Sequence, residues 1–288
     1  MYKLYIYIYI YISIIIFIYN MFRIRRNKKE LEKVLPKSRL KLPKKIKIFN
    51  LGSSHGYFSF NYDNLENAVN FSYPSQTLYY DYKIIKNYYD SLEENGICFV
   101  VLSYFSFTNK KFFVKEDIYS KTLKIKYLDK EDKIDGIIFQ YFPILNFIRK
   151  FFVKVKKRKL KEGNARIEKH VEMLEKQDEK FGIMILEKII KELKEKNIRV
   201  ILITTPFQRE YNDSFSQELL ENNFYSIVSM IKNKYNLTYY DFSHRYDLFG
   251  KNDLFSDFDH LNEKGSKIFM KEIEEILKIY YKLDNKKI

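Results

Sequence analysis

Short runs of apolar residues alternate along the chain with longer segments in which apolar residues recur every three to four positions. The apolar runs lie at residues 45–52, 67–72, 97–103, 199–205 and 237–243. The continuous apolar run at 97–103 is typical of a strand in the interior of a parallel sheet, and the other runs, which include polar residues, have the length of strands. Together these runs predict five such strands.

The longer segments have the spacing of amphipathic helices. They lie at residues 78–94, 178–196, 215–235 and 263–281. Gly96 is expected to stop the first of them, and Asn262 is a favourable N-cap for the last. The alternation of strands and helices predicts an α/β protein with a three-layer, flavodoxin-like fold, in which helices cover both faces of a five-stranded parallel sheet.

The N-terminal region contains 19 residues without a charge, at positions 4–22, and a basic cluster follows at 23–29. This length suits an N-terminal transmembrane helix. The positive-inside rule would place the domain that follows this helix in the cytoplasm. A domain on the outer side of the membrane would need the opposite orientation of the helix. No small-residue cleavage site follows, so a cleavable signal peptide is not expected.

A second interpretation of residues 1–22 is that they are not translated. The repeat YIYIYIYI at 5–12 could be encoded by a simple TA repeat upstream of a gene. Met21 would then be the start, and the protein would be cytoplasmic instead of membrane-anchored. Under both interpretations we expect a basic linker at 23–44 and a main domain at 45–282, with an insertion at about 104–175.

The predicted insertion contains aromatic clusters at 112–114 and 151–153 and a basic run at 150–161, and we expect it to cap the site. The whole chain has 52 Lys and Arg against 37 Asp and Glu, a net charge of +15. Such a charge allows binding to nucleic acid or to an anionic membrane. Because no nucleic-acid-binding motif is present, nucleic acid is not an expected partner. The single cysteine, Cys98, excludes an intrachain disulfide.

Candidate chemistry lies in two loops. Ser54 follows the first predicted strand, and Asp257 and His260 lie three residues apart just before the last predicted helix. A serine nucleophile needs a histidine base, which a carboxylate holds in the right tautomer. Loops at the carboxyl ends of parallel strands form the active sites of such sheets. We therefore predict a catalytic triad of Ser54, His260 and Asp257.

Other polar residues near these loops are expected to have structural roles. We expect Asp259 to be a solvent-exposed or capping carboxylate, His55 to pack or cap its loop, and His170 to be solvated. No histidine and carboxylate spacing demands a metal, and there is neither a phosphate-binding glycine loop nor a dinucleotide fingerprint. No metal and no cofactor are therefore expected.

The segments GSSHG at 52–56 and DFDHLN at 257–262 resemble the first and last blocks of the SGNH/GDSL hydrolase superfamily. Residues 72–82 and 100–107 are similar to SGNH-like proteins encoded with polysaccharide genes, which are distantly similar to the D-alanyl-lipoteichoic acid biosynthesis protein. The resemblance covers about residues 45–280. It implies that Ser54 is the nucleophile and that Asp257 and His260 complete the triad.

The resemblance also implies an oxyanion hole. Its expected donors are the backbone N–H of Ser54 and that of Ser72, which stands at the family's second-block glycine. The family's third-block asparagine is replaced by Ser103, and Gln76 could supply the missing amide. The loss of one oxyanion donor can lower the rate by ~10²–10³, so the replacement of the asparagine is expected to lower hydrolase activity.

Three functions follow as hypotheses. The first is a serine esterase or O-acyltransferase that acts on an ester of a carbohydrate or envelope glycan through an acyl-enzyme on Ser54. The second is a catalytically weak or inactive SGNH-fold protein that serves as a binding or assembly component of envelope polysaccharide synthesis. The third is a basic protein that binds nucleic acid or an anionic membrane, for which the charge is the sole support. The sequence leaves the acyl group, the acceptor and the oligomeric state open.

Overall fold

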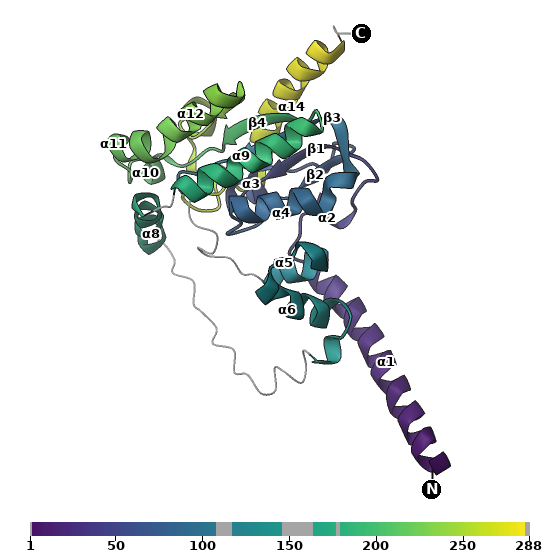
Figure 1. The fold of residues 1–288 in the computed structure, drawn as a ribbon. Helices are drawn as coiled ribbons and strands as arrows, with labels where there is room; N and C mark the ends of the chain where they lie inside the picture. The colour runs from purple at the N-terminus through teal and green to yellow at the C-terminus, as the bar shows by residue number, and fades with distance from the viewer. Residues whose placement is uncertain (1, 108–116, 146–163, 177–178, 286–288) are drawn as a thin grey trace. The chain divides into compact units, whose positions relative to one another are not determined.

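The computed structural model describes residues 2–107, 117–145, 164–176 and 179–285 (Figure 1). The chain divides into two compact units, a smaller one within residues 1–35 and 115–160 and a larger one within residues 36–114 and 161–288. The aromatic clusters at 112–114 and 151–153 and the basic run at 150–161 lie outside the described residues.

The larger unit is built on a five-stranded sheet in the order β2-β1-β3-β4-β5. Its strands are β1 (Ile46–Leu51), β2 (Ala68–Asn70), β3 (Leu92–Val101), β4 (Arg199–Thr204) and β5 (Thr238–Asp241). Every neighbouring pair is parallel. This is the flavodoxin-like strand order, so the predicted fold class is confirmed.

Helices cover both faces of this sheet (Figure 1). The longer helices of the larger unit are α4 (Leu78–Tyr88), α8 (Asn164–Glu175), α9 (Glu179–Glu195), α12 (Ser226–Tyr235) and α14 (Glu263–Asn285). The shorter ones are α2 (Lys37–Leu40), α3 (Ser54–Ser59), α10 (Arg209–Asn212), α11 (Gln217–Leu220) and α13 (Tyr246–Phe249). Phe99 and Ile201 pack with Phe269 of α14 in one buried cluster. Because side chains alternate along a strand, their sequence neighbours point to the opposite face, where α9 packs on β4 and α4.

The helix expected at 78–94 is shorter than predicted. It ends at Tyr88, and after a single 3₁₀ turn β3 begins at Leu92, which pairs with Ile46 of β1. Gly96 therefore lies within a strand and does not stop a helix. A Cβ at Gly96 would lie 2.7 Å from the carbonyl oxygen of Lys47, so this position needs glycine because two strands approach closely.

The smaller unit contains α1 (Tyr2–Glu32), α5 (Asp117–Thr122), α6 (Lys130–Gln140) and a 3₁₀ turn at Ile125–Tyr127. Among the described helices, α1 is the one that is long and apolar enough to cross a membrane, and its apolar window is 0% buried. A membrane anchor and a signal sequence share these properties. The helix continues to Glu32, so the first part of the stretch expected as a linker at 23–44 is helical.

Candidate active site

The loop that carries Ser54 is fixed by a glycine. Gly52 directly follows β1 and has a φ of 130°, and a Cβ there would lie 2.8 Å from the carbonyl oxygen of Val101. L-residues avoid this conformation, so the turn requires glycine. The backbone N–H of Gly52 donates to Asp81 Oδ1 at 2.9 Å. The turn places Ser54 at the first position of α3, at the carboxyl end of β1.

Ser54, His260 and Asp257 come together at this edge of the sheet. Ser54 Oγ lies 2.8 Å from His260 Nε2, although the two residues are 206 positions apart. Nδ1 of the same ring lies 2.9 Å from each carboxylate oxygen of Asp257. A carboxylate on Nδ1 favours the tautomer with its proton there, which leaves Nε2 to accept the proton of the Ser54 hydroxyl. The three predicted residues thus have the geometry of a catalytic triad.

Local backbone contacts hold the carboxylate of Asp257. The backbone N–H groups of Asp259 and His260 both donate to Asp257 Oδ1, at 3.2 and 3.0 Å. This turn is a local property of the DFDH segment, because Asp side chains readily bond to backbone N–H groups two or three residues ahead. The ring of Phe58, which is 40% exposed, lies 5.0 Å from the ring of His260. The imidazole is therefore held on two sides while the site stays accessible.

A second pair of the same residue types lies directly behind the first. His55 Nε2 lies 3.0 Å from Asp259 Oδ2, and the two side chains are 0% and 1% exposed. The rings of His55 and His260 stack with centroids 5.2 Å apart. Ser53 Oγ lies 3.3 Å from His55 Nδ1. The expectation of a solvent-exposed or capping Asp259 was wrong, because the loop turns this carboxylate inward to the buried His55.

Helix α8 contributes a cation that contacts both carboxylates. Arg166 donates from Nη1 to Asp257 Oδ2 at 3.0 Å and from Nη2 to Asp259 Oδ1 at 2.5 Å. One turn further along α8, Nδ1 of His170 lies 3.0 Å from the hydroxyl of Tyr211. The expectation that His170 is solvated was therefore wrong. Its spacing of four from Arg166 places both on one helix face, a sequence signal that the interpretation of His170 did not use.

The pKa shifts separate the roles of these groups. Burial raises the pKa of Asp259, but the hydrogen bond with His55 and nearby positive charge outweigh it, so this pKa lies below its usual value. For Asp257 burial is likewise outweighed, by hydrogen bonds from His260 and Arg166, and its pKa is also lowered. Burial lowers the pKa of His55 and lowers that of His170 to about 3. At neutral pH both carboxylates are ionised, and these two histidines are uncharged.

The expected oxyanion donors differ in what they bond to. The backbone N–H of Ser72 donates to Asn70 Oδ1 at 2.9 Å, and that of Ser103 donates to Ser106 Oγ at 2.7 Å. The side-chain amide of Gln76 donates to Asp81 Oδ1 at 2.6 Å and to the carbonyl of Phe71 at 3.0 Å. The N–H of Ser54 lies in the first turn of α3, where helix geometry supplies no intrahelical acceptor. Among the expected donors, the N–H of Ser54 is thus the one that its own helix leaves without an acceptor.

Two buried asparagines that the sequence interpretation missed support α3. Asn50 Nδ2 donates to Asn70 Oδ1 at 2.9 Å and to Ser72 Oγ at 2.7 Å. Asn70 Nδ2 in turn donates to carbonyls of α3 and its C-cap, at 3.1 Å to Gly56 and 2.8 Å to Phe60. The available signal was a polar residue inside each of two apolar runs, because buried amides need partners.

The site also contains a cluster of metal-ligand types. Among the described residues, His55, Asp259 and His260 offer ligand atoms within 4.8 Å of one another. These atoms take part in hydrogen bonds, and the guanidinium of Arg166 is bonded to the same carboxylate. A fixed positive charge on the carboxylate opposes binding of a cation, so the donor set does not fit a metal centre.

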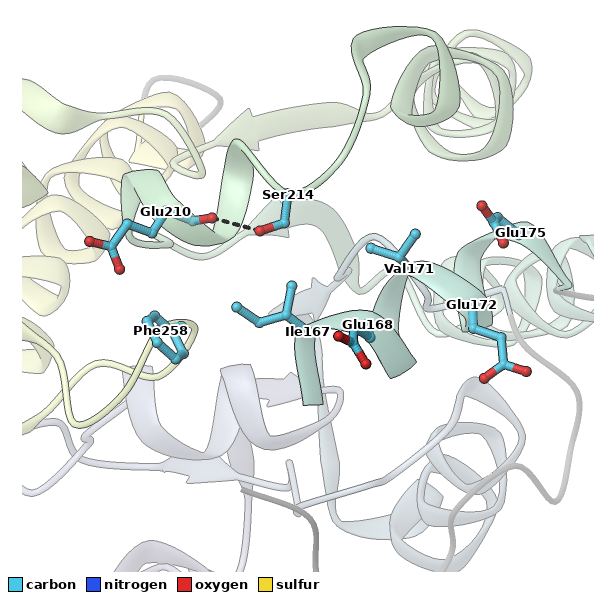
Figure 2. Close-up of a pocket in the computed structure, with 8 residues that line it drawn as sticks. All are labelled: Ile167, Glu168, Val171, Glu172, Glu175, Glu210, Ser214 and Phe258. Carbon is cyan, nitrogen blue, oxygen red and sulfur yellow. Dashed lines mark hydrogen bonds between the residues drawn. The ribbon is translucent and has the colours of Figure 1, made fainter. Parts of the chain in front are cut away.

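An open cleft of about 520 Å³ adjoins the triad loop through Phe258. Figure 2 shows Ile167, Val171 and three glutamates of α8 along one part of its wall, with Glu210 and Ser214 along another. The three glutamates of α8 are Glu168, Glu172 and Glu175. The cleft therefore combines apolar side chains with negative charge, which disfavours ligands that carry several negative charges of their own.

Comparison with known proteins yields structural likeness only. No family model matches the chain, and no curated protein matches it. A GDSL-like lipase from Bacteroides thetaiotaomicron is similar at 11% identity and a TM-score of 0.45, over 88% of this chain and 97% of that one. A protein assigned as an acylhydrolase from Bacteroides fragilis is similar at 11% identity and a TM-score of 0.42, over 84% and 93%. At these values the likeness defines neither a family nor an activity for this chain.

Proposed function

We propose that the protein is a serine esterase or O-acyltransferase with Ser54 as its nucleophile. The observation that carries the proposal is the continuous hydrogen-bonded path from Ser54 Oγ to His260 Nε2, at 2.8 Å, and from Nδ1 to Asp257, at 2.9 Å. A hydroxyl becomes a competent nucleophile when such a base takes its proton. A purely structural His–Asp pair would not need a serine on its second ring nitrogen.

The reaction proceeds in two halves. Ser54 Oγ attacks the ester carbonyl while its proton passes to His260 Nε2, and the backbone N–H of Ser54 stabilises the oxyanion. The ester C–O bond breaks as His260 returns that proton to the leaving alcohol, and the acyl group remains on Ser54. In the second half His260 deprotonates water or a sugar hydroxyl, which attacks the acyl carbon. The bond between that carbon and Ser54 Oγ then breaks, and His260 returns the proton to Ser54.

The substrate is proposed as an ester of a carbohydrate or envelope glycan. This class rests on the resemblance of residues 72–82 and 100–107 to SGNH-like proteins encoded with polysaccharide genes, which is an argument by analogy. The cleft beside Phe258 supports a ligand without several negative charges. We further propose that α1 anchors the protein in a membrane, because 19 uncharged residues suffice to span a bilayer.

A second function, that of a weakly active or inactive binding component of envelope polysaccharide synthesis, has one specific observation in its favour. The N–H groups of Ser72 and Ser103 and the amide of Gln76 all have internal partners. An enzyme with a single remaining oxyanion donor would turn over slowly, since each lost donor can cost ~10²–10³ in rate. This function keeps the fold and the cleft but not efficient catalysis.

Labelling by a fluorophosphonate probe tests the first proposal. We expect the full-length protein in detergent to be labelled, because the probe reacts with serines activated by a histidine base. Ser54→Ala should abolish labelling, and the matched neighbour Ser53→Ala should keep it. Absence of labelling in a folded wild-type sample, or labelling that survives Ser54→Ala, would reject Ser54 as the activated nucleophile and favour the second function.

A further inference from the structure

The smaller unit exposes an apolar surface outside the hydrophobic stretch of α1. Ile134, Ile137 and Tyr141, spaced by three and four residues along and just beyond α6, are 65%, 39% and 59% exposed. This spacing places them on one helix face. Phe142 and Leu145 extend the surface and are 50% and 46% exposed. We call these five residues the α6 patch.

The α6 patch is attached to α1 at a defined level along that helix. The backbone N–H of Ile144 donates to Asn20 Oδ1 at 3.0 Å. Seven residues further along α1, Nδ2 of Asn27 lies 3.5 Å from the carbonyl oxygen of Phe139, and Asn27 is buried. Residues 2–18 of α1 are exposed throughout, and partial burial begins at Tyr19. Among the residues that the structure describes, the rest of the unit therefore contacts α1 from about Tyr19 onward, beyond most of its apolar part.

This level coincides with the end of the apolar stretch. At 1.5 Å per residue, the 19 uncharged residues at 4–22 extend about 28 Å, close to the thickness of a bilayer core. Asn20 lies two residues before the end of this stretch, about 3 Å along the axis. The contact with Ile144 thus brings Phe142 and Leu145 close to the boundary between acyl chains and headgroups. Arg23, Arg25 and Arg26 follow on α1, where they would meet the headgroups.

We propose that the α6 patch binds the membrane interface beside α1, so that the smaller unit inserts it among the headgroups of an anionic bilayer. This inference rests on the proposed membrane anchor. Apolar faces of interfacial helices enter about 5–10 Å into this zone, and tyrosine is favoured there. The adjoining arginines are complementary to anionic lipid, at about 1 kcal/mol for each basic residue near the surface. A second protein or a second copy of the chain would cover the patch without lipid contact.

The absence of tryptophan from the chain gives a direct test. Phe142→Trp introduces a single conservative reporter into the patch of the full-length protein. Phe17→Trp reports the apolar part of α1, and His244→Trp reports an exposed site in the larger unit. Each variant is reconstituted in vesicles of phosphatidylcholine with about a quarter phosphatidylglycerol. Quenching by lipids brominated near the headgroup is compared with quenching by aqueous iodide.

We expect brominated lipid to roughly halve the emission of Phe142→Trp and of Phe17→Trp, with weak iodide quenching, and the reverse for His244→Trp. Iodide quenching of Phe142→Trp as strong as that of His244→Trp would overturn the proposal, because the patch would then face water. Protection from both quenchers would also overturn it, because protein would cover the patch. Loss of lipid quenching at Phe17→Trp would reject the anchor itself, so the two failures are distinguishable.

Discussion

The two histidine–carboxylate pairs of the larger unit use the same chemistry in opposite environments. Asp257 and Asp259 come from one loop, and their partners His260 and His55 stack on each other. Asp257 is 33% exposed and its pair reaches Ser54 at 2.8 Å, whereas the Asp259 pair is almost fully buried. Proton transfer to a substrate requires access, so the outer pair is suited to catalysis. The inner pair is suited to supporting the ring in front of it.

Arg166 connects the two pairs. It is bonded to both carboxylates, so one cation offsets two negative charges that would otherwise lie close together in a poorly solvated site. Arg166 belongs to α8, which lies within the predicted insertion. The insertion was expected to cap the site, but through Arg166 it also supplies a residue that is bonded to both carboxylates of the site. The same Asp-to-Asn substitution is therefore expected to lower mainly activity at Asp257 and mainly stability at Asp259.

The largest contrast is expected in activity. Asp257→Asn should lower kcat/KM for a simple aryl ester by ~10³–10⁴, because the amide no longer fixes the tautomer of His260. The thermal midpoint should change little, since Asp257 is partly solvated. Steady-state hydrolysis beside circular dichroism melting measures both. An activity within tenfold of the wild type would remove Asp257 from the proposed triad.

The inner pair should show the reverse pattern in stability. Asp259→Asn removes the charged acceptor of the buried His55 and one of the two carboxylates bonded to Arg166, and the loss of a hydrogen bond to a charged group costs about 1.5–3 kcal/mol. Urea unfolding, with Asp257→Asn as the matched control, measures the difference. Equal losses for the two variants would show that burial does not distinguish the pairs.

The pH dependence of stability should report the buried histidines. His170, with a folded pKa of about 3, binds fewer protons than its unfolded form, whose pKa is about 6.5, throughout that interval. The contribution of His170 to the free energy of unfolding should therefore be fully present above about pH 6.5. It should fall as the pH drops below that value, by up to ~1.4 kcal/mol per pH unit. The lowered pKa of His55 acts in the same direction. His170→Phe should give a shallower slope in urea unfolding between these pH values, and an unchanged slope would contradict its burial as a neutral ring.

The smallest effect is expected at Ser53. Its contact with His55 is long, at 3.3 Å, so Ser53→Ala should change stability by less than about 1 kcal/mol. Its esterase activity should stay within about threefold of the wild type, because the path from Ser54 to Asp257 is untouched. A loss of activity comparable to that of Ser54→Ala would mean that the inner pair takes part in the chemistry.

The sequence by itself determined the class of fold and the outer site. Short, mainly apolar runs between helical segments predict parallel strands. The rule that sites lie at the carboxyl ends of such strands then relates Ser54 to the DFDH loop. The turn that holds Asp257 is also local, since its contacts span two or three residues. These features depend on short-range pattern, which a single sequence contains.

Only the tertiary structure decided which polar residues are buried and what they contact. His170 was expected to be solvated, Asp259 to be solvent-exposed or capping and His55 to pack or cap its loop, and contacts across 41 to 204 positions bury the three together. The internal partners of Ser72, Ser103 and Gln76, three of the expected oxyanion donors, depend on the packing of loops against the sheet. The strand position of Gly96 depends on how closely β1 approaches β3. Burial and pairing are set by residues distant in sequence, so no local pattern encodes them.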